Sequence, residues 1–169
     1  TDNTAFGAEG YRLQVKHDDI IITAHQPAGI FYGIQTLLQM LPPEIKNSQK
    51  QKGIDWTVPC TDITDKPQFA WRGLMLDVSR HWFTKEEVKK YIDELAEYKM
   101  NVFHWHLTDD QGWRLEIKSL PRLTEVGAWR APRVGQWWQR APQQPGEETT
   151  YGGFYTQEDV KEVLAYAAE

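Results

Sequence analysis

Two apolar runs with an amphipathic segment between them form the clearest pattern in the chain. The runs cover residues 73–78 and 101–107. Between them, apolar side chains recur at spacings of three, four and seven, at Val88, Tyr91, Ile92 and Leu95. Such spacing predicts a helix over residues 84–98, and Thr84 with Glu87 has the pattern of a capping box at its start. Two apolar strands joined by a helix of this length predict a parallel strand–helix–strand unit.

The first 67 residues follow a different pattern, which predicts a small α+β sheet-and-helix domain over residues 1–67. Apolar residues alternate at positions 11, 13 and 15, and residues 17–19 turn the chain into a second strand, so we expect a β-hairpin. A helix follows with one apolar face, made by Ile30, Phe31, Ile34, Leu37, Leu38 and Leu41. Pro42 and Pro43 end it. Alternation over residues 54–60 predicts another strand, and Lys66-Pro67 breaks the chain.

The second domain is expected over residues 68–169. After the strand–helix–strand unit, residues 119–150 carry prolines and glycines and predict a long loop with short pairings, which in a compact domain is usually functional. Residues 156–159 have the spacing of a helix start. The predicted helix buries an apolar stripe made by Val160, Val163, Leu164 and Ala167.

Polar, chemically capable residues follow both apolar runs, at the strand ends where parallel α/β folds gather their ligand sites. Arg80 follows the first run, and its guanidinium is suited to grip the vicinal oxygens of a sugar. Spacing alone favours an ion pair with Asp77 or a loop carboxylate instead. Asp109 and Asp110 follow the second run; as neighbours in an extended chain they point to opposite faces, so we do not expect them to share one site. Paired carboxylates can divide acid and base roles. For either aspartate, helix capping or a loop salt bridge is the alternative to such a role.

His104 and His106 are two residues apart and therefore face the same side of the predicted strand. Some metal-dependent hydrolases hold zinc with such a pair, and Asp109 or His81 is the candidate third ligand. Packed, hydrogen-bonded core histidines explain the pair better. A metal-dependent hydrolase is kept as an alternative function.

Composition narrows the function classes further. The net charge is −5 with no basic block, which argues against nucleic acid as a partner. No apolar run approaches the roughly 20 residues of a membrane span, and the first residues do not form a signal segment. The single cysteine, Cys60, excludes an internal disulfide. Eight tryptophans suit sugar stacking, and the group at Trp129, Trp137 and Trp138 keeps a non-catalytic sugar-binding module open.

The segments at both strand ends resemble the β-N-acetylhexosaminidases of glycoside hydrolase family 20. They read RGLMLDVSRHWF and NVFHWHLTDDQGWR, and the likeness extends through residues 128–130 and 155–160. Upstream, PAGIFYGIQTLLQMLP resembles the small α/β domain that precedes the barrel in that family. The resemblance implies an α/β fold with the first two βα units of a (β/α)₈ barrel. A whole barrel needs roughly 250 residues, so we expect a truncated one that self-associates through its open edges.

The resemblance also implies a reaction and a site. The activity is removal of terminal β-linked N-acetylhexosamine from an oligosaccharide or glycoconjugate, by retaining hydrolysis in which the substrate's own 2-acetamido group attacks. Arg80 would hold the sugar's hydroxyls, His106 would line the pocket floor, and Asp109 would support the acid through a histidine that lies beyond the chain. No metal or cofactor is implied, and a periplasmic, extracellular or lysosomal location suits the family.

The family's catalytic Asp-Glu pair belongs to an H-x-G-G-D-E-like segment, which this sequence lacks. Its one Asp-Glu dipeptide, Asp93-Glu94, falls within the predicted helix, where surface salt bridges explain it better. We therefore expect the 169-residue chain to be inactive alone.

Overall fold

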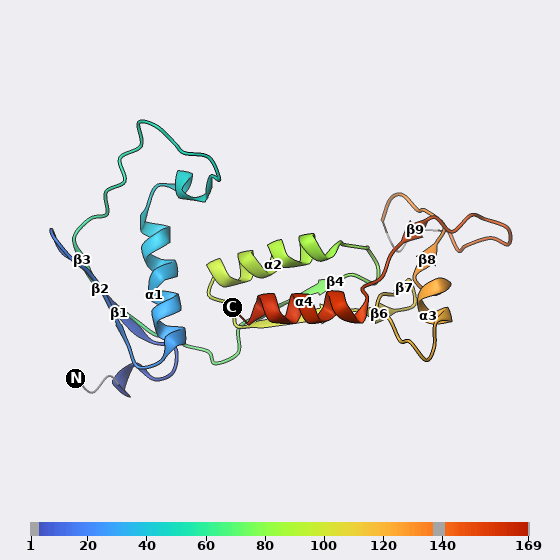
Figure 1. The fold of residues 1–169 in the computed structure, drawn as a ribbon, viewed down its shortest axis with the longest axis horizontal. Coiled ribbons are helices and arrows are strands. Elements are labelled where there is room, and N and C mark those ends of the chain that lie inside the picture. Colours follow the sequence, from blue (N-terminus) through green and yellow to red (C-terminus); the bar gives the residue numbers. More distant parts are fainter. Residues whose placement is uncertain (1–3, 137–140, 169) are drawn as a thin grey trace. The chain divides into compact units, whose positions relative to one another are not determined.

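The computed structural model describes residues 4–136 and 141–168. The chain forms two compact units (Figure 1). The first comprises the chain up to Arg72 together with Ala96–Lys99, and the second comprises Gly73–Leu95 and the chain from Met100 onward.

The first unit contains a three-stranded antiparallel sheet in the order β2-β1-β3. Strand β1 (Tyr11–Val15) pairs with β2 (Ile20–Ala24), so the predicted hairpin is confirmed. The third strand was predicted over residues 54–60, which is wrong: β3 spans Thr61–Asp65 and pairs with the other side of β1. Pro59 lies within the predicted range and has no N–H to donate to a strand partner.

Helix α1 (Pro27–Met40) lies beside this sheet (Figure 1), but it uses only part of the predicted apolar face, from which Leu37 packs against the core. Ile30, Phe31, Ile34 and Leu38 are 37–42% exposed. The helix instead buries Gly29, Tyr32 and Gly33. A Cβ at Gly33 would come within 2.6 Å of the Ile22 side chain, so the glycines allow the helix to approach the sheet closely. Short 3₁₀ helices, η1 (Thr4–Phe6) and η2 (Pro43–Lys46), complete this unit.

The second unit contains the predicted parallel strand–helix–strand arrangement. Strand β4 (Gly73–Asp77) pairs with β5 (Val102–His106) in parallel, with Asp77 opposite His106 at the carboxyl ends. Helix α2 (Lys85–Glu97) connects them. The Thr84 N–H donates to Glu87 Oε2 at 2.7 Å and the Glu87 N–H to Thr84 Oγ1 at 3.3 Å, which confirms the capping box.

Short elements follow β5. Strands β6 (Thr108–Asp109) and β7 (Gly112–Trp113) form a tight antiparallel pair. The predicted loop contains the one-turn helix α3 (Arg122–Glu125) and β8 (Trp129–Arg130), which pairs with β9 (Tyr151–Gly152). The loop with short pairings is thus confirmed where the structure describes it. Trp137 and Trp138 of the predicted aromatic group lie outside the described residues.

Helix α4 (Gln157–Ala167) begins with a capping box between Thr156 and Asp159. Its Val163 is buried in a core with Val78, Val88 and Tyr155. The predicted stripe is only partly right, because Leu164 is 63% exposed and Ala167 is exposed as well. One residue turns a helix by about 100°, so Leu164 points away from the core that buries Val163.

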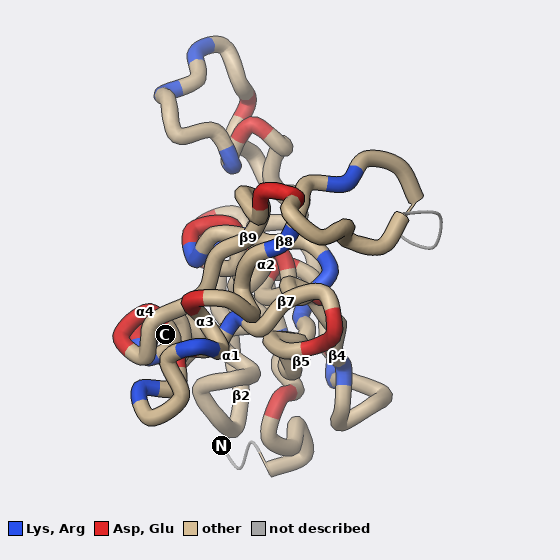
Figure 2. Tube along the Cα trace, turned by 90° about the vertical axis from the view of Figure 1, so that its right-hand side faces the viewer, with Lys and Arg blue, Asp and Glu red and all other residues tan. Residues whose placement is uncertain are grey.

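Helices α2 and α4 lie side by side (Figure 1) and are joined by ion pairs. The Lys85 ammonium contacts Asp159 Oδ1 and Glu162 Oε2 at 2.8 Å each, and the Lys89 ammonium contacts Glu162 Oε1 at 2.6 Å. Figure 2 shows basic and acidic positions interspersed along the described chain, without a long stretch of one sign.

The architecture is therefore α/β, without a closed barrel in the described residues. Within the same residues, every helix is too short or too polar to cross a bilayer.

Candidate functional site

The carboxyl ends of β4 and β5 bring four polar side chains together. Asp77 and His106 occupy paired positions in the two strands, and the chain turns immediately after each strand. Asp77 shapes the first turn, since its Oδ1 accepts hydrogen bonds from the backbone N–H groups of Ser79 and Arg80, both at 3.0 Å. This turn directs the Arg80 side chain back over the strand ends.

Arg80 is the centre of this cluster. Its Nη1 lies 2.7 Å from Asp109 Oδ2, 3.0 Å from Asp77 Oδ2 and 3.1 Å from His106 Nε2. The ion pair with Asp77, considered as an alternative to a ligand-binding role, is present together with the contact to Asp109. The Arg80 side chain is 37% exposed and is therefore accessible from solvent.

Asp109 completes the cluster from β6. Its Oδ2 lies 3.0 Å from His106 Nε2 and its Oδ1 accepts the Asp110 N–H at 2.8 Å. The Asp110 N–H, His106 and the Arg80 charge together lower the pKa of Asp109 below its ordinary value. The carboxylate thus stays ionised at neutral pH. Asp110 is exposed and, together with Arg80, lines the cavity described next.

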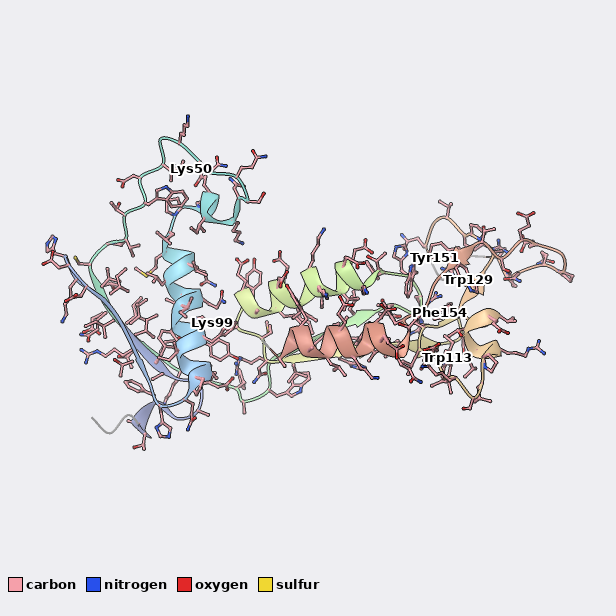
Figure 3. The ribbon with its side chains drawn as sticks, in the orientation of Figure 1. Lys50, Lys99, Trp113, Trp129, Tyr151 and Phe154 are labelled. Carbon is pink, nitrogen blue, oxygen red and sulfur yellow. The ribbon has the colours of Figure 1, made fainter. Side chains whose placement is uncertain are left out.

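A cavity of about 460 Å³ opens beside Arg80. Its walls include Asp110, Gln111, Trp129 and Arg130. Trp129 lies on β8 and Tyr151 on the partner strand β9 (Figure 3). Trp129 is 38% exposed, so it presents ring surface to this side of the unit. An apolar ring with polar and charged neighbours suits a carbohydrate.

The histidines do not assemble into a metal centre in the described part of the chain. The rings of His104 and His106 are 6.0 Å apart, and His104 is exposed. His81, a candidate third ligand, instead has its Nδ1 2.7 Å from the Tyr151 hydroxyl. Residues 4–136 and 141–168 contain no group of three or more His, Cys, Asp or Glu placed to hold a metal ion.

Three residues near the cluster were not identified from sequence as parts of a site. Arg130 Nη2 donates to the backbone oxygen of Arg80 at 2.9 Å. The Tyr151 hydroxyl accepts the Trp82 N–H at 3.1 Å and contacts His81, both from the turn after β4. Arg114 is fully buried behind the same turn. The likeness around residues 128–130 was the one available signal, and it did not assign a role to Arg130.

Comparison with known proteins gives consistent matches over both units. Residues 69–169 match "Glycosyl hydrolase family 20, catalytic domain", and residues 1–66 match "Glycosyl hydrolase family 20, domain 2". A β-hexosaminidase of Porphyromonas gingivalis is 46% identical over 161 residues, which are 95% of this chain and 19% of that protein. A β-hexosaminidase of Vibrio furnissii is 45% identical, over 99% of this chain and 25% of that protein.

A solved structure gives the same result. A mutant β-hexosaminidase of Streptomyces plicatus in complex with the product GlcNAc superposes with a TM-score of 0.80 at 45% identity. The match covers 96% of this chain and 29% of that one. The chain thus spans about a fifth to a quarter of the length of the two curated relatives above.

Proposed function

The chain belongs to glycosyl hydrolase family 20, and we propose that it forms part of a β-N-acetylhexosaminidase that removes terminal β-linked N-acetylhexosamine. The names of the relatives support this activity, and because the chain spans a minor part of them, the proposal concerns the complete protein. The observation that carries it is the contact of 2.7 Å between Arg80 and Asp109 at the ends of neighbouring parallel strands.

The fold assignment is part of the proposal. Strands β4 and β5 with helices α2 and α4 would be the first two βα units of a (β/α)₈ barrel. The parallel register of the strands and the adjacent packing of both helices support this. A complete barrel contains roughly 250 residues, so the remaining strands would come from the rest of the protein. The boundary between the small domain and the barrel is proposed at residues 67–68.

The proposed reaction is substrate-assisted, as in other members of this family. The 2-acetamido oxygen of the sugar attacks the anomeric carbon, which is effective because this nucleophile is already held in the substrate. A carboxylate orients the acetamido group, and a glutamic acid protonates the leaving oxygen. This chain does not supply that pair: Asp93 accepts a hydrogen bond from Tyr166 at 2.6 Å on the exposed side of α2, away from the strand ends.

Arg80 is proposed to hold the hydroxyl edge of the terminal sugar. Within the described residues, every hydrogen bond of its guanidinium uses Nη1, so Nε and Nη2 can donate to two vicinal oxygens. Asp77 and Asp109 fix the guanidinium from the protein side. His106 would form the pocket floor beneath it, and the ionised Asp109 would support the acid through a histidine from elsewhere in the protein.

The test is hydrolysis of a chromogenic N-acetyl-β-D-glucosaminide by the complete protein. The 169-residue chain alone should not turn it over. Arg80→Lys in the complete protein should lower kcat/KM about tenfold to a hundredfold, because a lysine keeps the charge but cannot offer parallel N–H groups to two vicinal oxygens.

Arg12→Lys is the matched control, since Arg12 pairs with Asp62 on the surface and is 45% exposed; its kcat/KM should not change. A complete protein without hydrolysis would refute the proposal. If N-acetylglucosamine binding in calorimetry survived Arg80→Ala, the Trp129 side of the cavity, and not the strand end at Arg80, would be the sugar site.

A further inference from the structure

Arg114 carries a charge that is completely buried, at 0% exposure. It follows β7, and its side chain donates to backbone oxygens only: Nε to Val78 at 3.0 Å, Nη2 to Ser79 at 2.9 Å, and Nη1 to Gly153 at 3.1 Å and to Ala128. In the described part of the chain, no carboxylate oxygen lies within 4.0 Å of it. Burial lowers its pKa from the ordinary value.

The acceptors come from three separate segments that surround Arg80. Val78 and Ser79 directly precede it, Ala128 leads into β8, and Gly153 follows β9. From β8, Arg130 then donates to the Arg80 oxygen at 2.9 Å. The Ser79 carbonyl on one side of Arg80 is thus held by Arg114, and the carbonyl of Arg80 itself by Arg130.

The surroundings are shaped to this guanidinium. A side chain at Gly112 would overlap it, and a side chain at Gly152 would overlap the Ala128 oxygen that accepts from it. The Arg114 guanidinium carbon lies over the Trp82 ring, 5.7 Å from the ring centroid. Ser79 Oγ donates to the Gly112 oxygen at 2.8 Å. This bond joins the turn after β4 to β7, in addition to the bonds from Arg114.

We infer that Arg114 is a positioning residue, which places the Arg80 guanidinium for the sugar by clamping the turn after β4 to the β8–β9 pair. This inference rests on the proposed role of Arg80. Arginine is required because a planar fork reaches acceptors on three sides at once, whereas a lysine ammonium presents its three N–H groups from one point. Arg114 itself does not touch the sugar, since its side chain is fully buried.

The test is a double-mutant cycle in the complete protein, with the inhibition constant of N-acetylglucosamine and the kcat and KM of a chromogenic glucosaminide as readouts. Arg114→Lys should raise the inhibition constant about tenfold or more, because a displacement near 1 Å weakens a positioned contact strongly. In the Arg80→Ala background, the same Arg114→Lys change should have almost no further effect. Equal effects in both backgrounds would overturn the inference.

Arg72→Lys separates positioning from stability. Arg72 is 17% exposed, pairs with Glu9 and donates to the backbone oxygens of Phe69 and Lys99 at 2.8 Å, but it belongs to the other unit. The Arg72→Lys substitution should lower the melting temperature without changing the inhibition constant of N-acetylglucosamine. If Arg72→Lys raised the inhibition constant as much as Arg114→Lys does, both changes would reflect a general loss of folding, and the inference would be overturned.

If Arg114→Lys does not yield folded protein, Ser79→Ala replaces it in the cycle. This change removes the Ser79–Gly112 hydrogen bond next to the Arg114 contacts. It should raise the inhibition constant less than Arg114→Lys does, and it should have almost no effect in the Arg80→Ala background. A rise that persists in the Arg80→Ala background contradicts the inference. A wild-type protein that neither binds nor hydrolyses the sugar instead contradicts the proposed function.

Discussion

The ion pair between Lys85 and Asp159 gives a stability prediction with a defined pH dependence. Lys85 Nζ lies 2.8 Å from Asp159 Oδ1, and Thr156 donates to the other carboxylate oxygen from its N–H at 3.0 Å and its hydroxyl at 2.8 Å. Lys85 first, and then Thr156, lower the pKa of Asp159 from 3.8 to about 2. The perturbation is Asp159→Asn, which keeps the shape of the side chain and removes its charge.

The expected magnitude follows from this pKa. The difference between the folded and ordinary values corresponds to about 2 kcal/mol. The Asp159 side chain is 26% exposed, so solvent screening reduces the expected loss to about 1–2 kcal/mol at pH 7. Because the pKa is lowered on folding, this stabilisation is complete above the unfolded value near 4 and disappears as the pH falls through about 2. At pH 3 about half of it should remain.

The assay is urea unfolding of the 169-residue chain followed by far-UV circular dichroism at pH 7 and pH 3. Asp159→Asn should lower the midpoint by about 0.5–1 M urea at pH 7 and by about half as much at pH 3. Glu158→Gln is the control, since Glu158 is in the same helical turn but is 66% exposed, with ammonium groups no nearer than 3.8 Å. An unchanged urea midpoint at pH 7, or a midpoint lowered equally at pH 7 and pH 3, would contradict this prediction.

Two other properties of the chain can be tested directly. The 169-residue chain should self-associate at high concentration, because Leu74 and Met75 are 49% and 53% exposed beside the open edges of the β4–β5 sheet; a monomeric mass in light scattering at every concentration would contradict this. Lys99→Met should lower the melting temperature by several degrees, because Lys99 Nζ donates to Tyr11 Oη at 2.9 Å and Thr36 Oγ1 at 2.5 Å. An unchanged melting temperature would show that this network does not stabilise the fold.

Elements with strong local signals could be predicted from sequence. The capping residues at Thr84 and Thr156 marked the starts of α2 and α4, and the apolar runs marked β4 and β5. Parallel pairing then puts the two strand ends at one edge, which is why Arg80 and Asp109 could be considered together. In the structure, Arg80 Nη1 lies 2.7 Å from Asp109 Oδ2.

The packing face of α1 could be predicted only in part from apolar periodicity, at Leu37. The pattern selects the largest side chains, but the helix contacts its sheet through Gly29 and Gly33, where close approach needs the absence of a side chain. The predicted position of β3 was wrong for a different reason. Alternation over residues 54–60 was a good strand pattern, but Pro59 and the register with β1 moved the strand to Thr61–Asp65.

Arg114 could not be found because its partners leave no trace in the sequence. Its acceptors are 14 to 39 residues away, and every residue has a backbone oxygen. An arginine after a short strand is indistinguishable from a surface charge until the fold is known. The contact between His81 and Tyr151, 70 residues apart, is hidden for the same reason.

The use of main-chain oxygens by Arg114 has an evolutionary consequence. Substitutions at Val78 or Ala128 leave the acceptor atoms in place, so these positions are free to drift among residues that fit the space. Selection should instead fall on Arg114 itself and on Gly112 and Gly152, where any added carbon would intrude. Mutational tolerance around the arginine should therefore be asymmetric, wide for its acceptors and narrow for the donor and its glycine neighbours.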